Sequence, residues 1–360
     1  MNEKNTDNRI LTVGLGERSY DIVIGGGVFA SAGARLADLA ADGAICVITD
    51  ENVNRLYGYA LAEALGRVGI GYETFVIPPG ERSKNMATLS DIYDWFWKDG
   101  RLNRFGLVVA FGGGVVGDLA GFAAATWMRG VRFVQIPTTL LAMVDSSVGG
   151  KTGIDTARGK NLVGAFHQPS LVLIDPKLLA TLPGREFGAG LAEVVKYGAI
   201  ASESLFSRLE AKGRDVELAD VIYECCSIKA NIVEADERDT GKRALLNFGH
   251  TFGHAIELKY GFERYNHGEA VAAGMHMAAC VGERLGVTES GTAGRVGILL
   301  SNLDLSFGKS VDGLIDYMRS DKKVLTDGVK LVLLTHVGDA ITRNVAWNEL
   351  EEAIYAENNR

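Results

Sequence analysis

Proline is scarce in this chain, at 6 of 360 residues, and cysteine is scarcer still, at 4. So few prolines argue against a disordered or collagen-like protein. The cysteines form no CxxC pair and no spacing typical of a disulfide framework. Free thiols belong to a reducing compartment, so we expect a cytoplasmic protein.

Positive charge is also in deficit, because 37 Lys and Arg face 45 Asp and Glu, for a net charge of −8. Nothing resembles the basic stripe of a nucleic-acid-binding protein, so we expect no nucleic-acid partner. The longest uncharged stretches, such as FGLVVAFGGGVVG, reach only about 14 residues, short of the roughly 20 that span a membrane. The start, MNEKNTDNRI, lacks the apolar core of a signal peptide. We therefore expect no membrane partner.

The first half of the chain alternates strand patterns with helix patterns. ILTVGL and YDIVIGGGV indicate a hairpin, and buried strands are indicated by AICVITD, YETFVIPPG, GLVVAFGGG, FVQIPTT and LVLIDP. Helix-like segments lie between several of these strands. Such alternation is typical of a mostly parallel sheet covered on both faces.

Beyond about residue 184 helical periodicity dominates, as in GAGLAEVVKYGAI and ADVIYECCSIKANIVEADE. Only KLVLLTHVG, near the end, has the pattern of a strand. We predict an α/β domain with a mostly parallel sheet over residues 1–183 and a mostly α-helical domain over residues 184–360. A chain of 360 residues is long enough for both domains to have a core.

A glycine turn in LVVAFGGGVVGDLAGFAAATWMRG joins a predicted strand to a predicted helix. Gly112, Gly114 and Gly117 satisfy the G-x-G-x-x-G pattern, which can place a pyrophosphate at a helix N-terminus. The simpler interpretation is a tight strand–helix turn without a ligand. The usual dinucleotide fingerprint has an acid about 20 residues further on, and RFVQIP offers none. A dinucleotide would therefore bind in a variant manner.

The segment VDSSVGGKTG resembles the P-loop of nucleoside triphosphatases. The first glycine of that pattern would fall at Asp145, so we exclude this class of enzyme. Lys151 nevertheless stands in a glycine-flanked turn, where a cation can meet a phosphate.

A polar stripe is predicted along LLNFGHTFGHAIE. If residues 243–257 form one helix, one face carries Arg243, Asn247, His250, His254 and Glu257. The other faces are mostly apolar, and buried polar groups need partners. Gly249 and Gly253 indicate that another backbone or a ligand comes close. The alternatives are a water-filled groove, or histidines satisfied by backbone carbonyls.

Four of the six histidines lie between residues 250 and 276, and His267 follows in NHGEA. Three histidines with a carboxylate nearby suit a zinc-type site, although spacing does not identify the ligands. LAEVVKYG offers Glu193 with Lys196 one helical turn on, which could equally be an ordinary surface ion pair.

Seven segments, taken in order between about Asp50 and Asp339, together resemble the 3-dehydroquinate synthase family of sugar phosphate cyclases. They are PPGERSK, GGGVVGDLAGFAAATWMRGV, QIPTTLLAMVDSSVGGKTGID, GKNLVGAFHQP, LAEVVKYG, LLNFGHTFGHAIE and HGEAVAAGM. The resemblance implies an N-terminal NAD-binding domain, a helical C-terminal domain, an active site between them and a homodimer. It also implies a divalent metal, zinc or else cobalt.

The activity that the resemblance implies is that of a phosphate-eliminating carbon–oxygen lyase of the shikimate pathway, which leads to aromatic amino acids. The family converts 3-deoxy-D-arabino-heptulosonate 7-phosphate to 3-dehydroquinate and phosphate. The steps are transient oxidation by NAD, phosphate elimination, re-reduction and intramolecular aldol closure.

Carried over position by position, the resemblance makes Glu193, His250 and His267 the metal ligands and His254 a proton-transfer group. NAD contacts would come from Asp50, Asn52, Glu81, Lys84, Gly113, Gly114, Val115, Gly117, Asp118, Thr138, Thr139, Lys151 and Lys160. Substrate contacts would come from Arg129, Asp145, Lys151, Asn161, Lys196, Lys229, Arg243 and Asn247, with Lys322 or Lys323 as a further candidate. Asp50 would then be the acid missing downstream of the glycine turn.

One position departs from the family pattern. Asp239 stands where family members commonly carry a glutamate that is discussed as a proton acceptor, and an aspartate reaches one methylene less far. Whether it takes that role is left open.

Three rival functions remain. A sister cyclase would make an inosose or a valiolone, but SIKANIV and KRALLNFGH keep the synthase pattern around Lys229, Arg243 and Asn247. A metal-dependent polyol dehydrogenase would not require this set of phosphate-binding residues. An NAD-binding module without catalysis would not retain Glu193 with three histidines.

Overall fold

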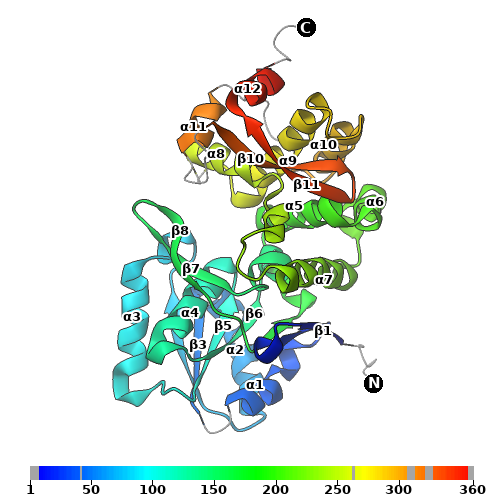
Figure 1. Cartoon of the computed structure of the whole chain (residues 1–360). Coiled ribbons are helices and arrows are strands. Elements are labelled where there is room, and N and C mark those ends of the chain that lie inside the picture. Colours follow the sequence, from blue (N-terminus) through cyan, green and yellow to red (C-terminus); the bar gives the residue numbers. More distant parts are fainter. Residues whose placement is uncertain (1–7, 41–42, 262–263, 306–312, 321–326, 356–360) are drawn as a thin grey trace. The chain divides into compact units, whose positions relative to one another are not determined.

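The computed structural model describes residues 8–40, 43–261, 264–305, 313–320 and 327–355 (Figure 1). The chain forms two compact units, and neither is continuous in sequence. The first comprises Met1–Pro183 and Leu218–Arg238, and the second comprises Gly184–Glu217 and Asp239–Arg360. The predicted boundary at residue 184 is thus one of three points where the chain passes between units. The division into functional domains stays a prediction.

The first unit is built on a seven-stranded sheet with the order β1-β2-β9-β6-β5-β3-β4. The strands are β1 (Arg9–Val13), β2 (Tyr20–Ile24), β3 (Ile45–Asp50), β4 (Tyr72–Ile77), β5 (Leu107–Gly112), β6 (Arg132–Pro137) and β9 (Leu171–Ile174). Every neighbouring pair is parallel except β1 and β2, which form the predicted antiparallel hairpin. The mostly parallel sheet is therefore confirmed.

Helices and loops cover both faces of this sheet, as residues of β5 show. Val108 and Ala110 point into an apolar core with α3 (Met86–Trp97) and α4 (Gly114–Thr126). Phe111, the next residue along the strand, faces the other way, and its ring stacks on that of Phe29 at 5.1 Å between centroids. The helices α1 (Ala32–Ala40) and α2 (Glu51–Gly66) pack against each other, and α2 and the turn at Phe29 are in contact.

Helix α7 (Leu218–Ala235) was predicted with the C-terminal helices but packs in the first unit. It contacts β1, β2 and the π-helix η6 (Ala142–Ser146), and Figure 1 shows it beside β1. The carboxylate of Glu234 accepts a hydrogen bond from the backbone N–H of Gly14 at 2.6 Å. Asp220 forms an ion pair with Arg9, and Glu237 forms one with Arg18, so both acids contact the N-terminal part of the first unit.

An antiparallel hairpin, β7 (Lys151–Thr156) and β8 (Gly159–Phe166), occupies a segment for which only a glycine turn was predicted. β8 has no continuous buried run, because exposed and half-buried residues alternate along most of it. Its sequence therefore lacks the apolar signal by which most strands of the main sheet were predicted.

The second unit is mostly helical and includes one hairpin. Its helices are α5 (Gly184–Ala201), α6 (Glu203–Lys212), α8 (His250–Tyr260), α9 (His267–Arg284), α10 (Thr292–Asn302), α11 (Leu314–Ser320) and α12 (Trp347–Tyr355). The predicted strand near the end is β10 (Gly328–His336), and it pairs with β11 (Asp339–Ala346), which was not predicted.

The prediction of one helix over residues 243–257 is wrong. A 3₁₀ helix, η9 (Lys242–Asn247), is followed by a break, and α8 begins only at His250. Gly249 causes the break with a left-handed φ of +81°. A Cβ there would lie 2.8 Å from the carbonyl oxygen of Val271 in α9. The expected close approach of another backbone at Gly249 is therefore confirmed.

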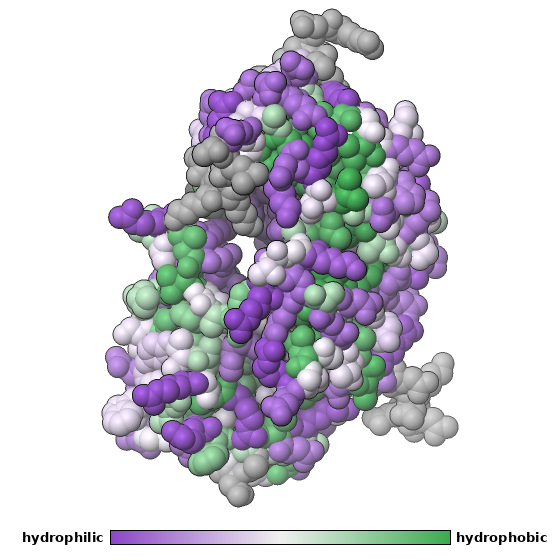
Figure 2. Space-filling model, viewed as in Figure 1, coloured by the Kyte–Doolittle hydropathy of each residue, from purple (hydrophilic) through white to green (hydrophobic). Residues whose placement is uncertain are grey.

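No helix in the described part of the chain combines the length and the apolar character needed to cross a bilayer. The face of the molecule in Figure 2 carries mostly hydrophilic residues, with hydrophobic ones in patches between them.

Candidate functional site

Residues predicted to bind NAD follow the carboxyl ends of neighbouring parallel strands. Asp50 ends β3 and caps α2 by accepting hydrogen bonds from the N–H groups of Asn52 and Val53. The glycine turn follows β5, and Thr138 and Thr139 follow β6. The strand order reverses between β3 and β5, and ligands of open α/β sheets bind at such a switch point.

The glycine turn leaves the start of α4 open. Gly113 is the N-cap, and no side chain in the described chain caps this helix. A Cβ on Gly113 would lie 3.1 Å from the Thr139 side chain, and one on Gly117 would lie 2.6 Å from the Gln135 amide oxygen. The glycines thus allow both the loop after β6 and strand β6 itself to approach closely. Helix N–H groups that point into such a turn can bind a phosphate.

Lys84, in the segment after β4, is hydrogen-bonded to residues of α4 and β8. Its ammonium is buried and donates hydrogen bonds of 2.5 Å to Asp118 and to the side-chain oxygen of Asn161. Burial alone would lower the pKa of Lys84, but the carboxylates of Asp118 and Glu81 outweigh burial and raise that pKa. The lysine therefore keeps its charge. Glu81 also lies 3.8 Å from the Lys160 ammonium.

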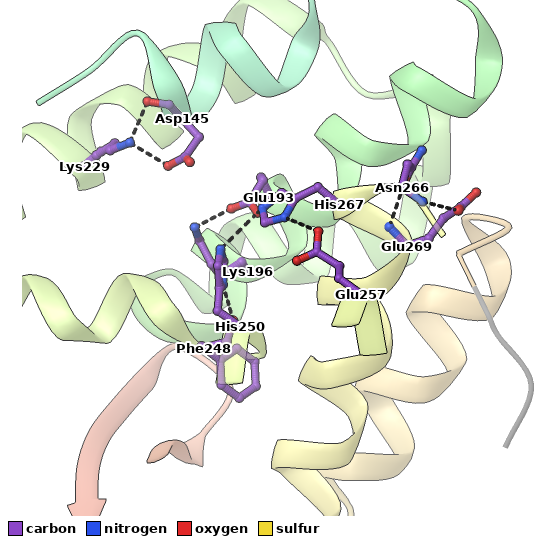
Figure 3. A network of polar contacts seen from close by, with 10 residues as sticks. All are labelled: Asp145, Glu193, Lys196, Lys229, Phe248, His250, Glu257, Asn266, His267 and Glu269. Atoms are coloured by element: carbon purple, nitrogen blue, oxygen red, sulfur yellow. Dashed lines mark hydrogen bonds and ion pairs between the residues drawn. The ribbon is translucent and has the colours of Figure 1, made fainter. Parts of the chain in front are cut away.

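Asp145 and Lys229, two predicted substrate residues, meet at the π-helix η6. The Lys229 ammonium donates to the backbone carbonyl of Asp145 at 2.5 Å and to its carboxylate at 2.6 Å (Figure 3). One turn earlier on α7, the buried thiol of Cys226 donates to the Met143 carbonyl at 3.3 Å. A π-turn is uncommon and recurs at functional sites.

Two other predicted residues of the first unit lie in the β7–β8 hairpin, at or beside left-handed backbone. Lys151 is exposed and follows Gly149 and Gly150, both left-handed, and Asn161 has a φ of +53°. Arg129 does not lie at the carboxyl ends of the parallel strands. It follows the far end of α4, a helix that begins there and spans about 20 Å. The candidates Lys322 and Lys323 lie outside the described residues.

In the second unit the structure brings Glu193, His250 and His267 together. Glu193, on α5, is completely buried, and its Oε1 lies 3.7 Å from Nε2 of His250 and 3.6 Å from Nε2 of His267. Figure 3 shows the three side chains pointing toward one another. One donor atom from each lies within 4.8 Å of the others. Ligand atoms about 2.1 Å from a tetrahedral ion are roughly 3.4 Å apart, so this triad fits a metal ion.

Close backbone packing next to each histidine produces this convergence. His250 and His267 are the first residues of α8 and α9. Gly249 lies against α9, as described above, and a Cβ on Gly268 would lie 2.2 Å from the Cα of Ala189 in α5. Ala189 precedes Glu193 by one helical turn. The glycines therefore bring the helices that carry the three donors into direct contact.

The second ring nitrogen of each histidine is also held. Nδ1 of His250 lies 3.2 Å from the carbonyl oxygen of Phe248, and Nδ1 of His267 lies 3.2 Å from Oε1 of Glu257. Such partners fix the tautomer and the ring orientation of metal-binding histidines. The carbonyl-bonded alternative raised from the sequence thus holds for one nitrogen of His250, while the other faces Glu193.

The two histidines differ in their proton affinity. Burial lowers the pKa of His250 to about 3, so that its ring is neutral. Burial would also lower the pKa of His267, but hydrogen bonds to Glu193 and Glu257 outweigh it and raise the pKa to about 10. A metal ion must therefore displace a proton from His267. Lys196 forms a buried ion pair with Glu193, so the surface ion pair considered from the sequence is excluded.

His254 lies next to the triad but is not one of the three donors. Its ring centroid is 5.7 Å from that of His250 and 6.5 Å from that of His267. His254 and Asn247 line a cavity of about 370 Å³ in the second unit, together with Asp239. Arg243 is buried on η9, at 2% exposure.

Sequence reasoning did not assign two features that hold His267. Glu257 was placed on the polar stripe without a role, although it holds Nδ1 of His267. Asn266 and Glu269 form a capping box at the start of α9, and Arg185 donates two hydrogen bonds to the Glu269 carboxylate, at 2.8 and 2.7 Å. The N-x-x-E spacing in NHGE is a signal that could have predicted this box.

Comparisons with known proteins were made over the whole chain. Residues 74–189 match the family model 3-dehydroquinate synthase N-terminal, and residues 190–324 match 3-dehydroquinate synthase C-terminal. The 3-dehydroquinate synthase of Geobacter metallireducens is 47% identical over 338 residues, covering 91% of this chain and 93% of the relative. That of Clostridium acetobutylicum is 44% identical, covering 95% of this chain and 98% of the relative.

Solved structures agree in fold. A 2-deoxy-scyllo-inosose synthase complexed with carbaglucose-6-phosphate, NAD⁺ and Co²⁺ is 27% identical with a TM-score of 0.86, covering 96% of this chain and 99% of that chain. A 2-epi-5-epi-valiolone synthase from Streptomyces hygroscopicus with NAD⁺ and Zn²⁺ is 31% identical with a TM-score of 0.85, at the same coverage. The fold is shared by a protein from Sinorhizobium meliloti described as a probable glycerol dehydrogenase. It is 17% identical with a TM-score of 0.60, covering 92% of this chain and 94% of that chain.

Proposed function

Because this chain belongs to the 3-dehydroquinate synthase family, we propose that it converts 3-deoxy-D-arabino-heptulosonate 7-phosphate to 3-dehydroquinate and phosphate. It would act as a phosphate-eliminating carbon–oxygen lyase of the shikimate pathway. The observation that carries this proposal is the convergence of Glu193, His250 and His267. A buried carboxylate and two oriented imidazoles, from three helices, form a metal-binding set typical of a catalyst.

We assign the metal site to Glu193, His250 and His267. Two nitrogens and one oxygen suit zinc, and cobalt accepts the same donors. Three protein ligands leave positions open for substrate hydroxyls, where a divalent ion supplies Lewis acidity that favours loss of a proton. Phe248 and Glu257 keep the two rings in the orientation that this site requires.

We assign NAD binding to the carboxyl edge of the sheet in the first unit. The open N-terminus of α4 would bind the pyrophosphate, with Thr138 and Thr139 beside it. Asp50, at the end of β3, has the position expected for a ribose partner. NAD bound there would supply the acceptor for a hydride from one alcohol of the substrate, and its reduced form would be the donor that restores that hydride.

The chain's own residues would bind the anionic substrate and move its protons. The imidazole of His254 stands beside the triad without being one of its donors, so it is placed to exchange a proton with a substrate oxygen. Asp145 and Lys229 hold each other at η6, which keeps their polar atoms in a defined position. Buried Arg243 and Lys196 add cations suited to oxyanions. Lys151, Asn161, Asn247 and Arg129 remain proposed substrate contacts.

The synthase is preferred to the sister cyclases on two grounds. The curated synthases are 43–47% identical over most of the chain, whereas the inosose and valiolone synthases are 27% and 31% identical. The segments around Lys229, Arg243 and Asn247 also keep the synthase pattern. A cytoplasmic location, supported by four free cysteines, and a homodimer complete the proposal.

A phosphate-release assay tests the proposal. Purified protein with NAD and a divalent metal should release phosphate from the heptulosonate phosphate, while absorbance at the NADH wavelength stays flat because NAD is regenerated in each turnover. A glucose phosphate, the substrate type of the inosose synthases, serves as the control. Stoichiometric NADH, or phosphate release from the control alone, would refute the assignment.

A further inference from the structure

The cavity beside the triad has a second wall that no predicted residue occupies. Its first wall carries Asn247, His250 and His254, which the proposed function already uses. The second wall belongs to the β10–β11 hairpin and presents Val329, Lys330, Val332 and Thr342. Both walls belong to the second unit. A ligand in this cavity would therefore contact the hairpin as well as the histidines.

The hairpin register explains why Lys330 faces the cavity. Residues two apart on a strand share a face, so Lys330 and Val332 point the same way. Val332 pairs directly with Thr342 on β11, which brings the threonine onto that face. Within β10 the residues next to Lys330 are buried, and one of them, Val329, also lines the cavity. The fold thus presents one ammonium group on an otherwise well-packed strand.

Lys330 differs from three buried lysines among the proposed site residues. Lys84, Lys196 and Lys229 are buried, and each forms an ion pair with a carboxylate. Lys330 is exposed, and no hydrogen bond or ion pair joins its ammonium to any residue that the structure describes. Its charge is available to a ligand without first breaking an internal contact.

The chemistry of the cavity suits an anionic polyol. Imidazole, amide and hydroxyl groups can bind hydroxyls as donors or acceptors, and the Asp239 carboxylate, which also lines the cavity, can accept from hydroxyls. An ammonium offers three donors to an oxyanion. The substrate of the proposed function carries two oxyanions, a carboxylate and a phosphate. We propose that Lys330 binds one of these oxyanions and helps to determine substrate specificity, an inference that rests on the proposed function.

Steady-state kinetics of Lys330→Ala test this role. We expect the KM for the heptulosonate phosphate to rise about tenfold while kcat changes less than about twofold, because a contact made equally in ground state and transition state affects KM alone. Lys330→Arg keeps the charge and should recover a KM within about threefold of the wild type. Lys212→Ala, at an exposed lysine that ends α6 and does not line the cavity, is the matched control and should leave KM unchanged.

Direct binding separates this inference from the proposed function. Inorganic phosphate and quinate, a polyhydroxy carboxylate without phosphate, are titrated calorimetrically into wild type and Lys330→Ala loaded with NAD and metal. Weaker phosphate binding alone identifies the phosphate as the partner of Lys330, and weaker quinate binding alone identifies the carboxylate. Both results support the inference even if the wild type fails to turn over the heptulosonate phosphate. Equal affinity of the two proteins for both probes would overturn it.

Discussion

Substitution of Glu257 tests whether the triad is a metal site with oriented ligands. Glu257 is 4% exposed, and its Oε1 lies 3.2 Å from Nδ1 of His267, on the side of the ring away from Glu193. A carboxylate in this position fixes the tautomer and makes the opposite nitrogen a better donor. We expect Glu257→Ala to weaken zinc binding by about 10- to 100-fold, which corresponds to roughly 1.4–2.7 kcal/mol.

The size of this effect follows from the number of ligands concerned. Only one of three donors loses its support, since Nδ1 of His250 is held by the backbone carbonyl of Phe248, which no substitution removes. Glu257→Gln keeps an acceptor oxygen of similar reach but loses the charge, so its loss should be smaller, about 3- to 10-fold. The expected order of zinc affinity is wild type, then Gln, then Ala.

Competition with a chromophoric zinc chelator at fixed pH measures these affinities. The visible spectrum of the cobalt-substituted protein reports the coordination geometry independently. Glu210→Gln is the matched control, because Glu210 forms a two-point contact with Arg295 in the same unit and is not one of the three donors. Thermal melting without metal identifies a variant that loses affinity only because it is unfolded. Zinc affinity that is unchanged in both folded Glu257 variants would refute the oriented-ligand reasoning.

Three further substitutions, with one control, test the histidines and the turn before them. His250→Ala should abolish metal retention, whereas His254→Ala should keep the metal and lose turnover, because only His250 is a donor of the triad. Metal analysis of both purified proteins measures this, and loss of metal from both would contradict it. Gly249→Ala should lower the free energy of unfolding by more than about 2 kcal/mol. The cost of a left-handed backbone at alanine adds to the steric clash of the new Cβ with the Val271 carbonyl oxygen. Gly286→Ala, left-handed but with open space around it, should cost only about 1 kcal/mol in the same denaturant titration.

Most strands of the main sheet could be predicted because they are short, apolar and largely buried. The edge strands β1 and β4 are mostly exposed or half-buried, but they carry the β-branched and aromatic residues that favour strands. β5 is buried at every position, and its neighbour β3 at all but the last. β8 and β11 escaped prediction because their residues alternate between exposed and less exposed positions, and many of them are polar or glycine. Their signal depends on pairing partners, and hydrophobic periodicity alone does not reveal these.

The candidate site was predictable in its members but not in its geometry. The spacing of His250 and Glu257 predicted that they share one face of a helix. The structure agrees, because both residues lie on α8. The same spacing suggested that the helix extends back to Arg243, which Gly249 prevents. Glu193 is far from the histidines in sequence and enters the triad through tertiary packing of α5. Only the resemblance to the family, and not the spacing, included it among the ligands.

The distribution of charge in the folded chain argues for function more strongly than the net charge of −8. Lys84, Lys196 and Lys229 are buried, and each is paired with a carboxylate, from Asp118, Glu193 and Asp145 respectively. A buried ion pair is weak evidence for stability, because apolar residues of similar size often stabilise a fold as well or better. Three such pairs in one chain are therefore not explained by folding alone. They are explained if each pair keeps an ammonium charged and in position until an anionic ligand arrives, as a substrate with a carboxylate and a phosphate requires.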